Sequence, residues 1–342
     1  MDPLSQGTVG AAFALSTANK NNLLKIGFIG FVAGLTPDLD VFIKSSTDPL
    51  LSLEYHRQFT HSLFFTPFGS LFVALLAYPL FKKSINFKTI YLACFFGYAT
   101  HGLLDACTSY GTQLFWPFSN ERVTWNNISI IDPLFTIPIL TFVVISIKTK
   151  KKLFNYFAIG WTIFYLTLGL IQYERALSSA KQLAYSRGHD VERLTLKPSF
   201  GNLILWKSIY QHEEYFYVDA IRTFQSSSWC FGDNIRAFNY ELHLPDLDKE
   251  SQQSKDIERF RWFSQDYLGF DHERKIVTDI RYSMIPNQIE PLWGILIDNN
   301  REKDEHALWW TGRSLSKTQL ELFKKMLSGK ECRNNLNKKA TH

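Results

Sequence analysis

The chain has 342 residues, a formal net charge of +5 and a mean hydropathy of −0.11. This length allows two structural units. The mild charge, without a basic stripe, a recognition helix or a zinc-finger spacing, argues against nucleic-acid binding. The average hydropathy hides a division near Tyr173, because long apolar runs fill the first half and charged residues, with Trp and Tyr, fill the second.

Five apolar stretches in the first half are each close to the 20 or so residues that cross about 30 Å of hydrocarbon. They cover residues 23–43, 59–81, 89–112, 131–147 and 153–173, and a shorter apolar segment at 4–18 precedes them. The sequence therefore predicts an all-α, multi-pass transmembrane bundle of about five spans plus a short N-terminal helix.

Lysines concentrate in alternate connections between these stretches. They lie at 20–25, at 82–88 and at 148–152, and basic loops of this kind usually face the cytoplasm. The remaining connections and everything after Tyr173 then face outward. We therefore expect a protein of the cytoplasmic (inner) membrane, in contact with the lipid bilayer, whose C-terminal domain is extracytoplasmic.

The second half has the pattern of a soluble α+β domain. Strands are predicted at residues 191–195, 203–210, 215–223, 275–284, 292–297 and 307–311, and helices at 256–267 and 316–327. Domain boundaries follow at 1–173 and 174–328, with a disordered tail from Gly329. Cys230 and Cys332 could pair if this domain is exported.

Ionisable residues within spans are costly and usually functional, and in this chain they collect toward one membrane face. They are Asp38, Asp40, His56, Arg57, His61, His101, Asp105 and Asp132. His101 and Asp105, four residues apart, share one helix face. His56 and His61 converge only if a helix begins between them, where Thr60 could cap it. Asp38 and Asp40 converge only if the chain unwinds after Pro37.

Three imidazoles with several carboxylates suit zinc, and also manganese or iron, better than calcium. The number of candidate ligands allows one or two ions. Asp132, which precedes a proline, suits a helix N-cap equally well, and Asp40 could simply end a helix. Glu54 and Arg57 are ordinary loop charges by default, but beside His56 they are candidates for a general base and a phosphate-binding cation.

At these residues the chain resembles a family of inner-membrane-associated, metal-dependent hydrolases, described as LexA-binding or LexA-regulated. The shared motifs lie at residues 1–6, 37–40, 56–57, 60–62, 101–105, 108–113, 116–118 and 131–133. Many relatives have His where this chain has Gln6, so the resemblance implies that Asp2 and Gln6 approach the site. The family is distantly similar to zinc-dependent phospholipase C and P1-type nucleases, which implies phosphoester hydrolysis.

The expected function is that of a membrane-embedded metallohydrolase. It would act on a phosphoester or another ester, lipid headgroups included, at the outer membrane face. Two alternatives stay open. One is a non-catalytic envelope protein with a structural metal, and the other is a metal or proton transporter. The transporter is disfavoured because the inner halves of the third and fifth stretches lack charged residues.

Overall fold

The computed structural model describes residues 1–334 and divides the chain into two compact units. The first consists of Met1–Ile43, Tyr55–Gln172 and Phe200–Leu203, and the second of Lys44–Glu54, Tyr173–Ser199 and the chain from Ile204 onward. Each unit thus includes a short segment that is flanked in sequence by residues of the other.

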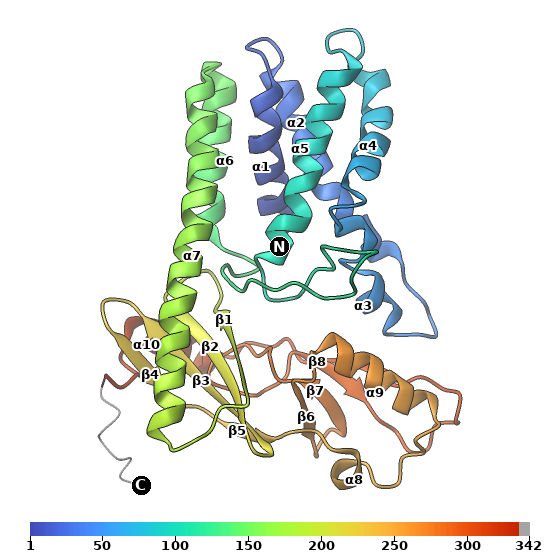
Figure 1. Ribbon diagram of the computed structural model, residues 1–342, viewed down its shortest axis with the longest axis vertical. Coiled ribbons are helices and arrows are strands. Elements are labelled where there is room, and N and C mark those ends of the chain that lie inside the picture. The colour runs from blue at the N-terminus through green and yellow to red at the C-terminus, as the bar shows by residue number, and fades with distance from the viewer. Residues whose placement is uncertain (335–342) are drawn as a thin grey trace. The chain divides into compact units, whose positions relative to one another are not determined.

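The first unit is helical (Figure 1). Its helices are α1 (Pro3–Ala14), α2 (Leu23–Leu35), α4 (Thr66–Phe81), α5 (Phe87–Ala106), α6 (Pro133–Thr149) and the first part of α7 (Lys152–Ser186). Three 3₁₀ turns interrupt the helical pattern: η1 (Leu15–Thr17), η2 (Thr36–Phe42) and η3 (Phe59–His61).

Helices α2 and α5 pack at a very short separation. A Cβ atom added at Gly97 would lie 2.5 Å from the Gly30 carbonyl oxygen, so a side chain at this position would force the helices apart. Small residues at a crossing allow such close backbone approach. This packing holds the end of α2, and η2 after it, beside the C-terminal half of α5.

The expected five-span bundle is wrong. Among residues 1–334, only α7 is long and apolar enough to cross a membrane; a second span is possible only if the pair Leu51–His61 and Thr66–Phe81, bent by 84°, counts as one. The apolar runs did not become helices of matching length. Helices α1, α2, α4 and α6 have 12, 13, 16 and 17 residues, because 3₁₀ turns and loops take up residues that had been assigned to spans. Helix α5 has 20 residues but includes Lys88, His101 and Asp105.

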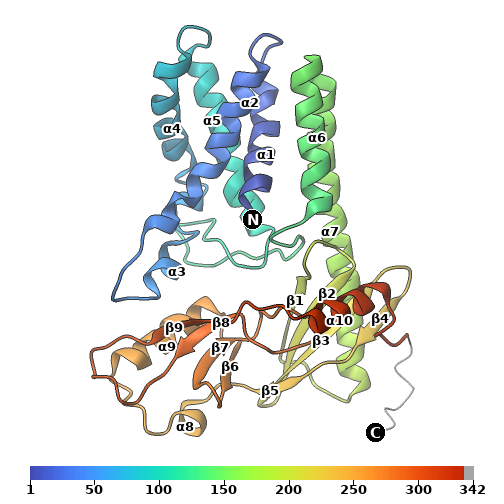
Figure 2. The same ribbon diagram turned by 180° about the vertical axis from the view of Figure 1, so that it is seen from behind.

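The second unit contains two antiparallel sheets together with helices (Figures 1 and 2). The first sheet has the order β1-β2-β3-β4, with β5 paired to β3; the second has the order β6-β7-β8-β9. The strands are β1 (Arg193–Pro198), β2 (Leu205–His212), β3 (Tyr215–Thr223), β4 (Ser227–Cys230), β5 (Asn234–Arg236), β6 (Leu268–Asp271), β7 (Ile276–Asp279), β8 (Trp293–Leu296) and β9 (Leu308–Thr311).

Alternation along β2 gives the first sheet two buried faces. Trp206 packs in a cluster with Ala176, Ala180 and Leu183 from the second part of α7. Leu205, its neighbour, packs on the opposite face with Met326 of α10 (Lys317–Ser328). The other helices of this unit are α3 (Leu51–Tyr55), α8 (Tyr240–His243) and α9 (Gln252–Phe263).

Part of the predicted disordered tail, residues 329–334, is described and makes contacts with the β-sheet unit. Cys332 forms a disulfide with Cys230, and Arg333 forms an isolated β-bridge with Trp229. Residues 335–342 lie outside the described part of the chain. The order of residues 329–334 follows from these contacts, which composition alone does not reveal.

Candidate metal centre

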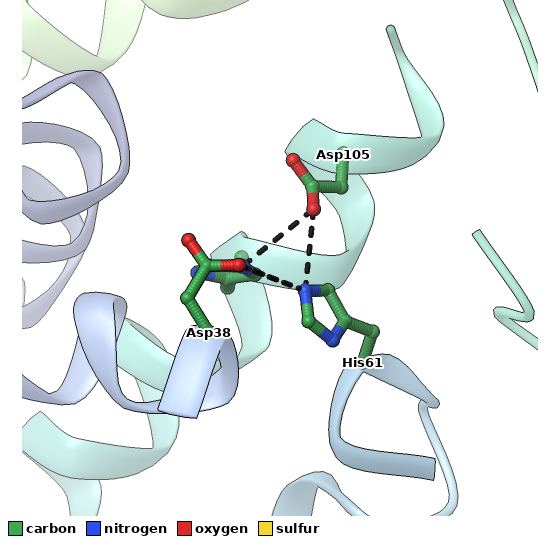
Figure 3. Close-up of side chains that lie close together, drawn as sticks. Asp38, His61 and Asp105 are labelled. Atoms are coloured by element: carbon green, nitrogen blue, oxygen red, sulfur yellow. Dashed lines mark hydrogen bonds and ion pairs between the residues drawn. The ribbon is translucent and has the colours of Figure 1, made fainter. Parts of the chain in front are cut away.

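Four side chains from three separate segments converge in the first unit. They are Asp38 from η2, His61 from η3, and His101 and Asp105 from α5. The side chains of His61, His101 and Asp105 are fully buried, whereas that of Asp38 is 27% exposed. Figure 3 shows Asp38, His61 and Asp105 pointing toward one another. The group is therefore closed on three sides, with Asp38 on its accessible side.

The donor atoms of this group have regular spacing. The Nε2 atoms of His61 and His101 are 2.9 Å apart, and Asp38 Oδ1 is 3.4 Å from each of them. Asp105 Oδ2 is 3.3 Å from His61 Nε2 and 3.6 Å from His101 Nε2. Zinc bonds of about 2.0–2.1 Å place neighbouring ligands of a tetrahedron about 3.3 Å apart. The four donors fit one ion of this size.

Each buried imidazole is held in orientation by contacts to its Nδ1 atom, the ring nitrogen that faces away from the group. His101 Nδ1 donates to the Gly34 carbonyl oxygen at 2.6 Å, which leaves the Nε2 lone pair free for a cation. His61 Nδ1 lies 3.2 Å from Asp40 Oδ2 and 3.0 Å from Thr60 Oγ1. A carbonyl or carboxylate behind the ring is the usual arrangement for a metal-binding histidine.

Asp105 has one oxygen that neighbouring residues satisfy and one that they do not. Its Oδ1 accepts a hydrogen bond from Gln6 Nε2 at 2.8 Å and contacts the Met1 amino group. Its Oδ2 is buried and, within the described chain, accepts no hydrogen bond, although Arg57 Nε forms an ion pair with it at 3.0 Å. A buried carboxylate oxygen aimed at two imidazole nitrogens is a position that a cation would fill.

The close approach of η3 to α5 depends on the residue that follows His101. A Cβ atom added at Gly102 would lie 2.1 Å from the His61 carbonyl oxygen. Only glycine fits at this point without a shift of η3. Gly102 therefore allows His61 and His101 to come together.

Asp40 organises the segment next to the four-residue group. Its Oδ1 lies 2.7 Å from His56 Nδ1, and its Oδ2 accepts hydrogen bonds from the Arg57 backbone N–H at 3.0 Å and the Thr60 hydroxyl at 2.8 Å. Thr60 does not cap a helix as expected, because it lies inside η3 and α4 begins only at Thr66. Asp38, Asp40 and His56 form a second, more exposed group whose atoms could hold an ion.

The two carboxylates of η2 stay ionised. Burial raises the pKa of Asp38, but hydrogen bonds with His101 and His61 outweigh it and hold that pKa below its ordinary value. Burial acts the same way on Asp40, and hydrogen bonds with His56 and His61 again lower its pKa overall. Both carboxylates are therefore available as anionic ligands at neutral pH.

Arg57 points into the protein. Its Nη1 donates to Thr108 Oγ1 at 3.0 Å, and its guanidinium carbon lies 4.7 Å from the centre of the Tyr110 ring. Its backbone is left-handed, with φ of 63°. Together with the ion pair to Asp105, these contacts make Arg57 a partner of a candidate ligand, on the inner side of the site.

Three of the sequence candidates belong to neither group and form their hydrogen bonds elsewhere. Asp132 caps α6, accepting hydrogen bonds from Leu134 N at 3.1 Å and from the Tyr165 hydroxyl at 2.8 Å, and burial raises its pKa. Asp2 caps α1 through Ser5 N at 3.0 Å. Glu54 accepts a hydrogen bond from Arg259 Nε at 2.5 Å.

Three features that hold the sequence candidates in place were not predicted from the sequence. They are the Gly34 carbonyl behind His101, the close contact at Gly102 and the Arg259 guanidinium bound to Glu54. A glycine directly after a candidate ligand was a usable signal for close approach. A carbonyl partner and an arginine 205 residues away from Glu54 have no local signature.

These features define a helical unit with a buried histidine–carboxylate group that could hold a metal ion. The chain belongs to the YdjM inner membrane protein family, whose model matches residues 1–176. It is also 31% identical over 101 residues to the "Uncharacterized protein YfhP" of Bacillus subtilis (strain 168). That match covers 30% of this chain and 30% of the relative. No solved structure matches the chain.

Proposed function

We propose that the protein is a membrane-bound, metal-dependent hydrolase that acts on a phosphoester or a related ester at the membrane surface. The observation that carries the proposal is the convergence of Asp38, His61, His101 and Asp105 at the mutual spacing of zinc ligands. Two imidazoles with two carboxylates favour zinc among the divalent ions, with manganese or iron as substitutes. The resemblance to metal-dependent hydrolases supports the reaction class.

The residues of this chain have separate tasks in the proposal. The four donors hold the ion, while the Gly34 carbonyl and Asp40 keep His101 and His61 turned toward it. When bound, a divalent ion supplies Lewis acidity and lowers the pKa of water at the site. Asp38 is the donor nearest to solvent, so an ester reaches the site from its side. Arg57 neutralises and holds Asp105.

Three features support the proposal that the candidate site lies on the outer side of the membrane. Lysines 148, 150 and 151 precede α7 and Lys152 begins it. Helix α7 is the one unbroken candidate span among residues 1–334, and basic flanks favour the cytoplasm. The second part of α7 leads into the β-sheet unit, which carries the Cys230–Cys332 disulfide, and disulfides persist outside the cytoplasm. Lys44–Glu54 belongs to the same unit, and it lies between Asp40 and His56. We therefore place the candidate site on the outer side.

The test compares His101→Ala with His272→Ala, a histidine of the β-sheet unit that lies outside both candidate groups. The full chain, purified in detergent, is assayed for bound metal by elemental analysis and for hydrolysis of a chromogenic phosphodiester and of phospholipid vesicles. We expect His101→Ala to lose metal and hydrolysis together and His272→Ala to keep both. Hydrolysis that persists unchanged in His101→Ala contradicts the proposal.

A structural metal is the second candidate, and the number of donors favours it. Four protein ligands complete a tetrahedral shell, whereas catalytic zinc sites usually have three and leave one position for water or substrate. Metal content without hydrolysis of any substrate in the panel, in a protein that loses thermal stability on chelation, would support this alternative.

A further inference from the structure

Arg259 joins the segment between two site residues to the β-sheet unit. Its guanidinium forms two parallel hydrogen bonds with Asp48, Nη1 to Oδ1 at 3.0 Å and Nη2 to Oδ2 at 2.8 Å. Its Nε donates to Glu54 Oε1 at 2.5 Å. Both carboxylates lie in Lys44–Glu54, which the contacts of the fold assign to the β-sheet unit. Arg259, in α9, thus binds this segment near its middle, at Asp48, and at its end, at Glu54.

The arginine is itself anchored. Its Nη1 also donates to Asp256 Oδ1 at 3.0 Å, one turn earlier on α9. The Asp256 side chain is fully buried, and its Oδ2 accepts a hydrogen bond from the Ala307 backbone N–H at 2.9 Å and lies 2.9 Å from His306 Nδ1. The network therefore connects the segment to the start of β9, so the segment cannot move without disturbing this sheet.

Asp48, Asp256 and His306 could be mistaken for a third metal site. They lie close enough to hold an ion, but the Arg259 guanidinium already supplies the positive charge between Asp48 and Asp256. Bidentate arginine–carboxylate pairs are also stronger and more directional than a simple charge contact. We therefore interpret this group as a network of ion pairs between side chains.

The held segment has a short path to the candidate metal centre at both ends. Asp40 lies four residues before Lys44, and His56 lies two residues after Glu54. Asp40 in turn orients His61 and contacts His56. Within the segment, Asp48 also accepts a hydrogen bond from Leu50 N at 2.9 Å, and Leu50 is 1% exposed. Asp48 lies eight residues after Asp40, and Glu54 lies two residues before His56. A displacement of the segment is therefore passed along the chain to both site residues.

We propose that Arg259 is a positioning residue for the metal centre, and that through it the β-sheet unit sets the metal affinity of the helical unit. The proposal rests on the metal centre proposed above. Arg259 lies beyond residues 1–176, the part matched by the family model. The β-sheet unit of this chain therefore supplies a support for the site that the family-matched part does not contain.

The test measures zinc affinity of the full chain in detergent by competition with a chromogenic chelator. Loss of groups that orient metal ligands typically weakens binding 10- to 100-fold, so we expect Arg259→Ala to weaken zinc binding at least about tenfold. Asp48→Asn removes the bidentate partner from the other side, and it should give a similar loss that does not add fully to that of Arg259→Ala. Arg259→Lys keeps the charge without the fork and should restore part of the affinity.

The matched control is Arg274→Ala. Arg274 also pairs with two carboxylates of the β-sheet unit, Asp271 and Glu290, but it does not contact Lys44–Glu54. This variant should bind zinc as the unaltered chain does. Hydrogen exchange over residues 44–58 should become faster in Arg259→Ala and stay unchanged in Arg274→Ala.

The outcomes separate the two proposals. Unchanged zinc affinity in both Arg259→Ala and Asp48→Asn overturns the positioning role and leaves the metal centre intact. An equal loss in Arg274→Ala also overturns it, because the effect would then report general loosening of the unit. An unaltered chain that binds no zinc removes the metal centre, and the positioning role with it.

Discussion

Replacement of Gly102 by Ala tests whether the metal centre depends on the close approach of η3 to α5. The added Cβ atom would lie 2.1 Å from the His61 carbonyl oxygen, whereas ordinary contacts begin at 3.4 Å. The carbonyl belongs to the backbone and cannot rotate away as a side chain would. The η3 turn must therefore move by about 1.3 Å, and it takes His61 Nε2 with it.

This movement is large on the scale of metal coordination. Distances in a working site stay within about 0.2 Å of their ideal values, so a shift of about 1.3 Å removes His61 from the ligand set without changing its chemistry. We expect zinc affinity to fall at least about tenfold, as it does when a group orienting a ligand is lost. Hydrolysis, if the proposed reaction is correct, falls in parallel.

The assay is zinc competition on the purified full chain, with a thermal melt of each variant. Gly160→Ala is the control, since a Cβ atom at this position in α7 meets nothing within 4 Å. Alanine is a better helix former than glycine by about 1 kcal/mol, so the control should fold and bind zinc normally. Gly102→Ala with native zinc affinity and native stability would refute the reasoning.

Two further predictions concern the β-sheet unit. The Cys230–Cys332 disulfide closes a loop with a sequence separation of 102 residues. Reduction, or Cys230→Ser, should therefore lower the unfolding free energy of the β-sheet unit by about 2–5 kcal/mol. Equal denaturant melts with and without reductant would contradict this. Burial lowers the pKa of Lys207 to about 7 in the folded protein. The unfolded chain, with the ordinary lysine pKa of 10.5, therefore binds this proton more tightly. The free energy of unfolding should rise as the pH increases from about 7 to about 10.5. Lys207→Met should flatten that rise, and an unchanged pH profile would count against it.

The residues that meet at the candidate metal centre could be predicted from the sequence, but the number of spans could not. His61, His101 and Asp105 attract attention because such side chains are costly within apolar segments. Their partners on the far side of each ring, Asp40 and the Gly34 carbonyl, depend on how η2 and η3 turn. Hydropathy cannot show where an apolar run changes from an α-helix to a 3₁₀ turn, and this change removed the long spans.

In the β-sheet unit, too, only the elements with a local sequence signal could be predicted. The strand at Tyr215–Thr223 and the helix starting after Ser316 were predicted, because β-branched content and a capping serine are local signals. The short strands β4 and β5 were missed, since each has only three or four residues. The partner of Glu54 could not be predicted, because Arg259 is remote in sequence.

Two short segments restrict where this protein can be divided into fragments. They are Lys44–Glu54 and Phe200–Leu203, and each belongs to the unit that does not flank it in sequence. One cut at the boundary after Gln172 would give an amino-terminal fragment that carries Asp48 without Arg259, and a carboxy-terminal fragment that carries Leu203 without its partner Gln172. Each fragment would therefore lack contact partners that the whole chain supplies. Chimeras and truncations of this chain should therefore transplant or delete both units together.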